Sequence, residues 1–331
     1  MSFFAVLFAL LIEQLKPLPN RNPVHHGLAR WVRWAGQNFD AGQPVHARVV
    51  WGITVLVPAL LLALVYRVID PFSTILALGW DILVLYLTLG FRQFSHHFTD
   101  IRDALDAGKE DRARELMAEW QNVDASDLPR TELLRHVIEH SLLAAHRHVF
   151  GVFFWFVVMS SLGLGPAGAV LYRMAEFTSR YWSYKSHVTG TPTHDGLLKL
   201  SQRLFVLIDY IPARMTAFGF AVVGNFEDAV GAWRQHAVLW VNANEGIILS
   251  AAAGAVGVRL GGKAAPAATS DLDVSRTLTE GGEVDERDAA GSTAGAEPQM
   301  GHLSSVVALI WRSVVLWMLL LALLSLANLV G

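Results

Sequence analysis

Long stretches that are almost free of charge are the feature that most restricts how this chain of 331 residues can fold. They cover residues 56–68, 75–91, 149–164 and 306–330. A helix that crosses a bilayer needs about 20 mostly apolar residues, and these runs approach that length. Only 17% of the chain is charged, against roughly 25% in soluble domains. The sequence therefore predicts an all-α, polytopic integral membrane protein whose first partner is the lipid bilayer.

Composition excludes several other classes. The formal net charge of -3 leaves no basic footprint, so we expect no nucleic-acid partner. The chain has no cysteine, which excludes disulfides, thiolate metal sites and a cysteine nucleophile.

The order of apolar and polar stretches predicts five segments. Arg30, Trp31, Arg33 and Trp34 are typical of an interfacial amphipathic helix, and the Gly-, Ala- and Ser-rich stretch after the third segment is typical of disorder. We expect N-terminal membrane helices with a basic amphipathic loop at 1–91, a soluble helical insert at 92–148, a broken-helix membrane region at 149–262, a disordered linker at 263–302, and a C-terminal transmembrane helix at 303–331.

The run from 149 to 174 has two interpretations. Residues 149–161 cover only half a span, and the Gly- and Pro-containing stretch at 163–168 interrupts helix formation. In the first interpretation a kinked helix crosses the bilayer; in the second the segment is re-entrant and returns to the same side. Lysines and arginines on both flanks favour the re-entrant interpretation, because the positive-inside rule places both flanks in the cytoplasm.

Several histidines lie on the helix predicted after residue 131. His136 and His140 are one helical turn apart, a spacing that could hold a metal. Because no Glu-x-x-His frame or second ligand pair accompanies them, we expect a solvated helix face instead.

The stretch 172–214 combines dense polar and ionisable groups with apolar flanks. Charges at membrane depth are costly, so they usually face a protein cavity and carry function. We therefore expect any functional site to be organised within this stretch.

Four motifs resemble those of one known family. They are the insert sequence at 103–116, the Gly-Pro-Ala-Gly run at 165–168 that leads into Tyr172-Arg173, the Ile-Pro-Ala-Arg run at 211–214, and the small-residue tail at 244–262. In this order they resemble the CobD/CbiB family of cobalamin-biosynthesis membrane proteins, and the resemblance covers nearly the whole chain.

The resemblance implies an adenosylcobinamide-phosphate synthase, a multi-pass protein of the bacterial inner membrane. Such an enzyme joins aminopropanol, or its phosphate, to the propionate carboxylate of adenosylcobyric acid, a corrinoid, using ATP and Mg²⁺. This chemistry needs acidic groups for Mg²⁺ and basic groups for phosphates. The matched positions give catalytic candidates Glu176, Asp209 and Arg214, substrate- or phosphate-binding candidates Arg173, Tyr184 and Arg259, and a metal-ligand candidate, Glu139.

Several matched positions depart from the family pattern. Where the pattern carries Glu, Asn and Asp, this chain has Leu143, Ala144 and Arg147, and an expected Asn is Glu176. A hydrophobic side chain cannot replace a magnesium ligand, so most of the expected acidic set is missing.

The same stretch also resembles the AmpE family of inner-membrane signalling or accessory proteins. The run at 209–214, followed by 224–233, is similar to the AmpE pattern, whereas the tail at 246–262 is closer to CobD/CbiB. An enzyme and a non-catalytic AmpE-like protein therefore both stay open. A transporter, suggested by broken helices alone, is a third hypothesis that no internal repeat supports.

Two candidates have structural alternatives. Asp209 and Arg214 could form an internal ion pair that anchors a broken helix, because an unpaired buried charge is costly. Arg259, beside two glycines, could bind phosphate or simply extend its charged end to the membrane surface.

Overall fold

The computed structural model describes residues 2–16, 23–121, 125–126, 128–187, 193–262 and 291–330, and these residues form helices and connecting turns without a named strand. The all-α prediction is therefore confirmed. The elements are α1 (Ser2–Leu15), α2 (Pro23–Phe39), α3 (Pro44–Trp51), η1 (Gly52–Leu56), α4 (Val57–Ile69), α5 (Thr74–Thr88), α6 (Phe91–Asp106), α7 (Glu110–Gln121), α8 (Arg130–Ala145), η2 (His146–Phe150), α9 (Gly151–Ser161), α10 (Ala167–His187), α11 (Asp195–Ile208), α12 (Tyr210–Val223), α13 (Phe226–His236), η3 (Ala237–Leu239), α14 (Ala243–Val256) and α16 (Met300–Val330).

Three continuous helices in the described chain are long and apolar enough to cross a membrane. They are Pro44–Ile69 with 26 residues, Arg130–Ser161 with 32 and Met300–Ala327 with 28. A fourth candidate is the pair α11 and α12, which bends by 46° at its break. The first two helices stay continuous because the π-turns η1 and η2 join α3 to α4 and α8 to α9. The prediction of helices of membrane-spanning length, one of them broken near Asp209, is confirmed.

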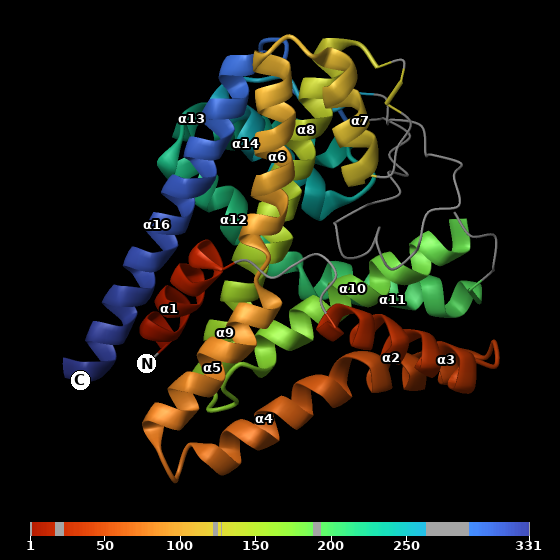
Figure 1. The fold of residues 1–331 in the computed structure, drawn as a ribbon, viewed down its shortest axis with the longest axis vertical. Helices are drawn as coiled ribbons and strands as arrows, with labels where there is room; N and C mark the ends of the chain where they lie inside the picture. Colours follow the sequence, from red (N-terminus) through yellow and green to blue (C-terminus); the bar gives the residue numbers. More distant parts are fainter. Residues whose placement is uncertain are drawn as a thin grey trace.

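The helices are arranged around the long α8–α9 helix (Figure 1). Helices α6, α7, α13 and α14 gather around its first half, while the α4–α5 hairpin lies near the other end. Helix α1 lies beside α16 along one edge and also packs on α5. The predicted amphipathic helix at the N-terminal side is present as α2, with Ala29 and Val32 buried and Arg30 and Arg33 exposed.

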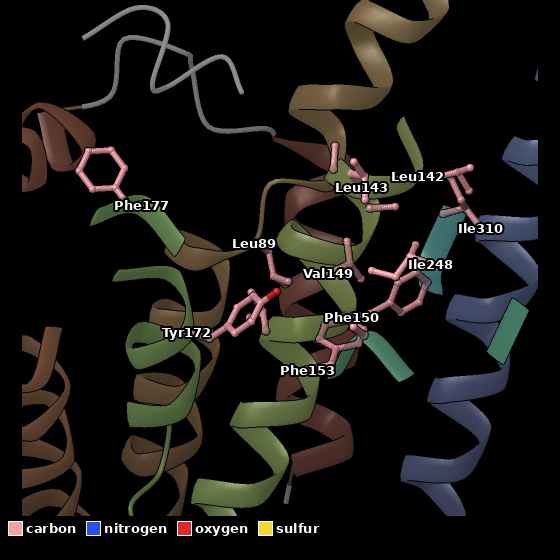
Figure 2. Packing of buried hydrophobic residues seen from close by; sticks show 14 of the residues in the cluster. Leu89, Leu142, Leu143, Val149, Phe150, Phe153, Tyr172, Phe177, Ile248 and Ile310 are labelled. Carbon is pink, nitrogen blue, oxygen red and sulfur yellow. The ribbon is translucent and has the colours of Figure 1, made fainter. Parts of the chain in front are cut away.

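The core lies where α8–α9 meets α12, α14 and α16. Figure 2 shows Val149, Phe150 and Phe153 on this helix, with Ile248 nearby and Ile310 on the neighbouring α16. The ring of Phe150 lies 5.9 Å from that of Phe220 on α12. Burying a side chain of this size contributes about 1.5–3 kcal/mol, so this contact region holds the four helices together.

The stretch after α9 folds as a tight turn that sends the chain back along α9. Gly163 and Gly165 have φ of 69° and 56°, a left-handed conformation that favours glycine. At Gly168 a Cβ atom would collide with the carbonyl of Trp155, so glycine also permits the close approach of α10 to α9. The chain thus reverses at 163–168 rather than continuing as one kinked helix, and the side of the membrane that each end faces stays a prediction.

The predicted boundary between residues 148 and 149 differs from the structure. Residues 149–161 are the end of a 32-residue helix rather than half a span, so the boundary at 148/149 falls inside one helix. The π-turn η2 keeps the backbone bonded across that point, which the sequence pattern did not indicate.

Of the predicted linker 263–302, residues 263–290 lie outside the described residues. Residues 291–299 are fixed to the segment after α14, and Thr293 N donates to Leu260 O at 2.8 Å. Helix α16 begins at Met300, so the folded C-terminal region starts before residue 303.

Candidate functional site

The break between α11 and α12 places Asp209 inside the protein, where its side chain is 7% exposed. Its Oδ1 lies 2.7 Å from Nε2 of His146 and accepts a hydrogen bond from the Tyr172 hydroxyl at 2.8 Å. Its Oδ2 accepts from Nδ2 of Asn244 at 3.2 Å. A carboxylate can only accept, so we assign a proton to Nε2 of His146. The other ring nitrogen of His146 lies 2.9 Å from the Thr216 hydroxyl.

Three helical elements distant in sequence, η2, α10 and α14, therefore bring side chains to one carboxylate. We call Asp209, His146, Tyr172, Asn244 and Thr216 the Asp209 group. Pro212 helps to place Asp209 at the start of α12. Backbone N–H groups in the first turn of a helix have no partner within the helix, so the N–H that proline lacks is not missed there. Gly151 leaves room for Tyr172, since a Cβ atom at that position would collide with the phenol ring.

The ion-pair interpretation expected Arg214 to pair directly with Asp209. Instead, Arg214 bonds other groups. Its Nη1 donates to the carbonyl of Tyr210 at 2.7 Å and to Oδ1 of Asn244 at 3.3 Å. The guanidinium also lies over the Tyr210 ring, 3.3 Å from its centroid. The amide of Asn244 thus joins the two predicted catalytic residues, because it donates to Asp209 and accepts from Arg214.

A second polar group surrounds Glu176 on α10. Arg173 Nη1 donates to Glu176 Oε2 at 2.9 Å, and Arg180 Nε lies 3.1 Å from Oε1. These arginines are one helical turn on either side of Glu176, so helix periodicity alone brings them together. Burial tends to raise the pKa of Glu176, but the charges of Arg180, Arg173 and Arg147 outweigh it and lower the pKa below the ordinary carboxyl value.

Glu176 and Arg180 line a small pocket with residues from α8 and η2. The other lining residues are His140, Leu143, Ala144, Arg147 and His148. We call this the arginine pocket. Arg147 Nη2 also donates to Glu245 on α14 at 2.7 Å. Among the residues that the structure describes, the buried Nδ1 atom of His148 has no hydrogen-bond partner, so a polar ligand or water has a donor or acceptor to meet there.

The π-turn η2 connects the two groups. It carries His146, Arg147 and His148 in succession: the first contacts Asp209, the second contacts Glu245, and the third lines the arginine pocket. Single π-turns inside α-helices are frequent at functional sites. Asn244 and Glu245, adjacent in α14, belong to the same pattern, since each reaches one of the two groups.

The remaining predicted site residues are placed elsewhere. Glu139 Oε1 accepts from the backbone N of Gly261 at 2.7 Å and from Arg135 Nη1 at 3.1 Å. Arg259 is exposed and pairs with Glu297 at 2.9 Å. Tyr184 is buried on α10, beyond the residues that line the arginine pocket.

The described residues do not fit a magnesium ion at Glu139. Its carboxylate is already neutralised by Arg135 and bonded to a backbone amide. In the part of the chain that the structure describes, no group of three or more His, Asp or Glu side chains could hold a metal. Magnesium needs several oxygen ligands in octahedral geometry, and a single paired glutamate does not supply them.

The histidine interpretation was wrong. His136, His140, His146 and His148 are all buried, rather than on a solvated face. The helix that carries them is packed on several sides, so its polar residues face the protein interior. His146 and Arg147 are the functional candidates that the sequence analysis missed. The sequence did contain a signal for these two residues, because the successive polar residues 146–148 interrupt a stretch that is otherwise apolar.

These features define an all-helical protein with helices of membrane-spanning length and a buried polar centre at a helix break. The family model "CobD/Cbib protein" matches residues 5–288. The chain therefore belongs to the CobD/CbiB family.

Curated relatives agree with this assignment. The chain is 30% identical over 328 residues to "Cobalamin biosynthesis protein CobD" of Stutzerimonas stutzeri, covering 96% of each chain. It is 34% identical over 183 residues, 55% of each chain, to the protein of that name from Chromobacterium violaceum. A Leptospira interrogans protein of that name is 22% identical over 78% of this chain and 80% of its own length. No solved structure matches the chain.

Proposed function

We propose that this chain acts in cobalamin biosynthesis as an adenosylcobinamide-phosphate synthase in the bacterial inner membrane, which it crosses several times. The observation that carries the proposal is similarity along 96% of the chain to a relative called a cobalamin biosynthesis protein. The reaction is the one that the family resemblance implies: an amide forms between aminopropanol, or its phosphate, and the propionate carboxylate of adenosylcobyric acid.

The chemistry of this reaction suits the two polar groups. ATP supplies a phosphoryl group to a carboxylate oxygen, with release of ADP. The amine nitrogen then displaces that phosphate, forming the amide and releasing inorganic phosphate and a proton. Arg147, Arg173 and Arg180 hold the anionic groups, because guanidinium forks match phosphate and carboxylate oxygens. In this proposal the released proton reaches Nδ1 of His146 through the Thr216 hydroxyl, 2.9 Å away, because Nε2 already carries the proton that it donates to Asp209 at 2.7 Å.

ATP and magnesium remain the proposed cofactors. Because the carboxylates near the site already bond to arginine or histidine, a magnesium ion held by protein side chains has no part in this proposal. Magnesium that accompanies ATP is bound by the nucleotide's own phosphate oxygens, as is common for this ion.

A second candidate function is a non-catalytic, AmpE-like accessory role. One observation favours it: Leu143, Ala144 and Arg147 stand where the CobD/CbiB pattern has acidic or amide residues, and all three line the arginine pocket. These three departures thus lie in one place. The enzyme proposal interprets Arg147 as a fixed positive charge that takes over the role of a bound cation.

Complementation distinguishes the two functions. A bacterial strain without its own cobinamide-phosphate synthase is grown where cobalamin must be made from cobyric acid, with this chain expressed in its membrane. We expect growth with the wild type and no growth with Asp209→Asn or Arg147→Gln, while Arg112→Gln, which changes an exposed residue on α7, grows normally. Failure of the wild type to support growth, with the protein present in the membrane, would favour the accessory role.

A further inference from the structure

A separate cavity of about 390 Å³ lies between α2, α4, α5 and α10. Each of these helices contributes side chains at helical spacing. On α5 they are Trp80, Leu83, Val84, Leu87 and Thr88, positions that recur on one face of a helix. Eight residues of helix rise by about 12 Å. The cavity is therefore about as long as the hydrocarbon of one leaflet, which is half of a core about 30 Å thick.

The cavity opens toward the apolar outer surface of the protein. Leu61 on α4 and Leu83 on α5 both line it, and they are 56% and 47% exposed. The outer faces of the same two helices carry further exposed apolar residues, including Leu60, Leu64 and Leu76. Helix α4 belongs to a candidate membrane span. A molecule that enters between Leu61 and Leu83 therefore comes from the hydrocarbon of the bilayer.

Among the described residues, the lining is apolar apart from Thr88, Arg173 and the indole N–H of Trp80. The Thr88 hydroxyl already donates to backbone carbonyls of its own helix, at 2.9 and 3.1 Å. Arg173 is therefore the charged group that a ligand in this cavity meets. One of its guanidinium nitrogens bonds Glu176, and a guanidinium has five donors in total, so donors remain for an anion.

We propose that this cavity binds one anionic phospholipid, with an acyl chain along α5 and the phosphate at Arg173. The apolar lining and the opening between α4 and α5 suit a lipid acyl chain, and the guanidinium of Arg173 suits a negatively charged head group. The lipid site shares Arg173 with the proposed reaction, but lipid retention can be measured without that reaction. The cavity also reaches the arginine pocket, because Arg173 lines the cavity and contacts Glu176, which lines the pocket.

Native mass spectrometry of the full-length protein, purified in a mild detergent, tests this site. Dioleoylphosphatidylglycerol and dioleoylphosphatidylcholine are added in separate titrations, and retained lipid is counted. We expect one retained phosphatidylglycerol, bound about fivefold more tightly than phosphatidylcholine, as one arginine near an anionic lipid provides. Equal retention of the two lipids, or retention of detergent alone, would overturn the proposal.

Three variants separate the parts of the site. Leu62→Trp fills the cavity and should lose both lipids, whereas Leu64→Trp makes the same change on the exposed face of α4 and should keep them. Arg173→Gln should keep the retained lipid but lose the preference for phosphatidylglycerol. If Leu62→Trp is poorly folded, Leu87→Trp fills the same cavity from α5. Unchanged lipid retention in a folded cavity-filling variant would show that the lipid binds elsewhere.

Discussion

Asp209 and Glu139 are both buried carboxylates, but they are held in different ways. Glu139 lies on a helix of membrane-spanning length, and Asp209 lies at the break between α11 and α12. Glu139 pairs with Arg135, four residues earlier on the same helix, and with one backbone amide from Gly261. Asp209 is held by side chains 35, 37 and 63 residues away. The first arrangement fixes the segment after α14 to α8. The second gathers a histidine, a tyrosine and an asparagine around one acceptor, which is an arrangement that can hold and move a proton.

The comparison teaches that a buried carboxylate is a functional candidate when its partners can both donate and accept hydrogen bonds, whereas an arginine can only donate. Arg135 stays charged at any pH that the folded protein survives, so its pairing with Glu139 is structural. His146 contacts Asp209 directly through Nε2, and its other ring nitrogen faces the Thr216 hydroxyl, so Asp209 belongs to a chain of groups that can both donate and accept. Glu139 is therefore a clamp between elements, and Asp209 is the carboxylate of the candidate site.

The largest expected effect is at Asp209. Asp209→Ala removes the acceptor of His146, Tyr172 and Asn244 together, and buried donors left without partners each cost about 1–3 kcal/mol. We expect a loss of about 3–5 kcal/mol in the free energy of unfolding, measured by denaturation of the purified protein in detergent. Asp209→Asn keeps an acceptor and should lose much less stability. A loss below 1 kcal/mol for Asp209→Ala would mean that the Asp209 group does not form as described.

Glu139→Leu should have the next largest effect, about 2–4 kcal/mol, because it removes the buried carboxylate that opposes the charge of Arg135. The double variant Arg135→Leu with Glu139→Leu should recover most of that loss, since no buried charge then remains. The same denaturation experiment checks both. A double variant as unstable as the single one would show that the bond from Gly261, rather than the ion pair, supplies the stability.

A smaller effect concerns pH and Glu176. The pKa of this group is lowered in the folded protein, with burial opposed by the charges of Arg180, Arg173 and Arg147. Its contribution to stability is therefore fully present above the unfolded carboxyl pKa of about 4.3 and is lost as pH falls through the folded value. Between about pH 6 and pH 3 the wild type should lose more stability than Glu176→Gln. Parallel pH profiles for the two proteins would contradict the arrangement around Glu176.

The smallest effect is expected at Arg259. Its ion pair with Glu297 is exposed, and such pairs contribute about 0.2–1 kcal/mol. Arg259→Gln should therefore change stability by less than about 1 kcal/mol. It should also leave growth in the complementation experiment unchanged, although the family resemblance implied a phosphate-binding role. A loss of growth with unchanged stability would return Arg259 to the substrate site.

The sequence predicted the helical fold and the helix break near Asp209, because apolar length, proline and glycine act locally. It also predicted that the stretch 172–214 would hold polar residues of the site, and Tyr172 and Asp209 do meet there. It did not predict the partners from outside that stretch, His146 and Asn244, because contacts between distant elements depend on how the helices pack. The same reason explains why Arg259 and Glu139, singled out by motif, lie apart from the Asp209 group.

The continuity of α8 with α9 was missed for a related reason. Eight polar or charged residues from 135 to 148 indicated a soluble helix, whereas burial against α12, α14 and α16 places several of them inside the protein. A polar face that is satisfied internally cannot be distinguished by periodicity from one that faces water. Only the three-dimensional packing separates the two.

Product formation by membranes that contain this chain tests the central claim most directly. Adenosylcobyric acid, aminopropanol phosphate, ATP and magnesium are added to membranes from the synthase-deficient strain, and the corrinoid products are identified by mass. The account predicts the amide product and ADP with the wild type, and neither above background with Asp209→Asn. Absence of the amide with the wild-type protein folded in the membrane would contradict the enzyme assignment and leave the buried polar centre with an accessory role.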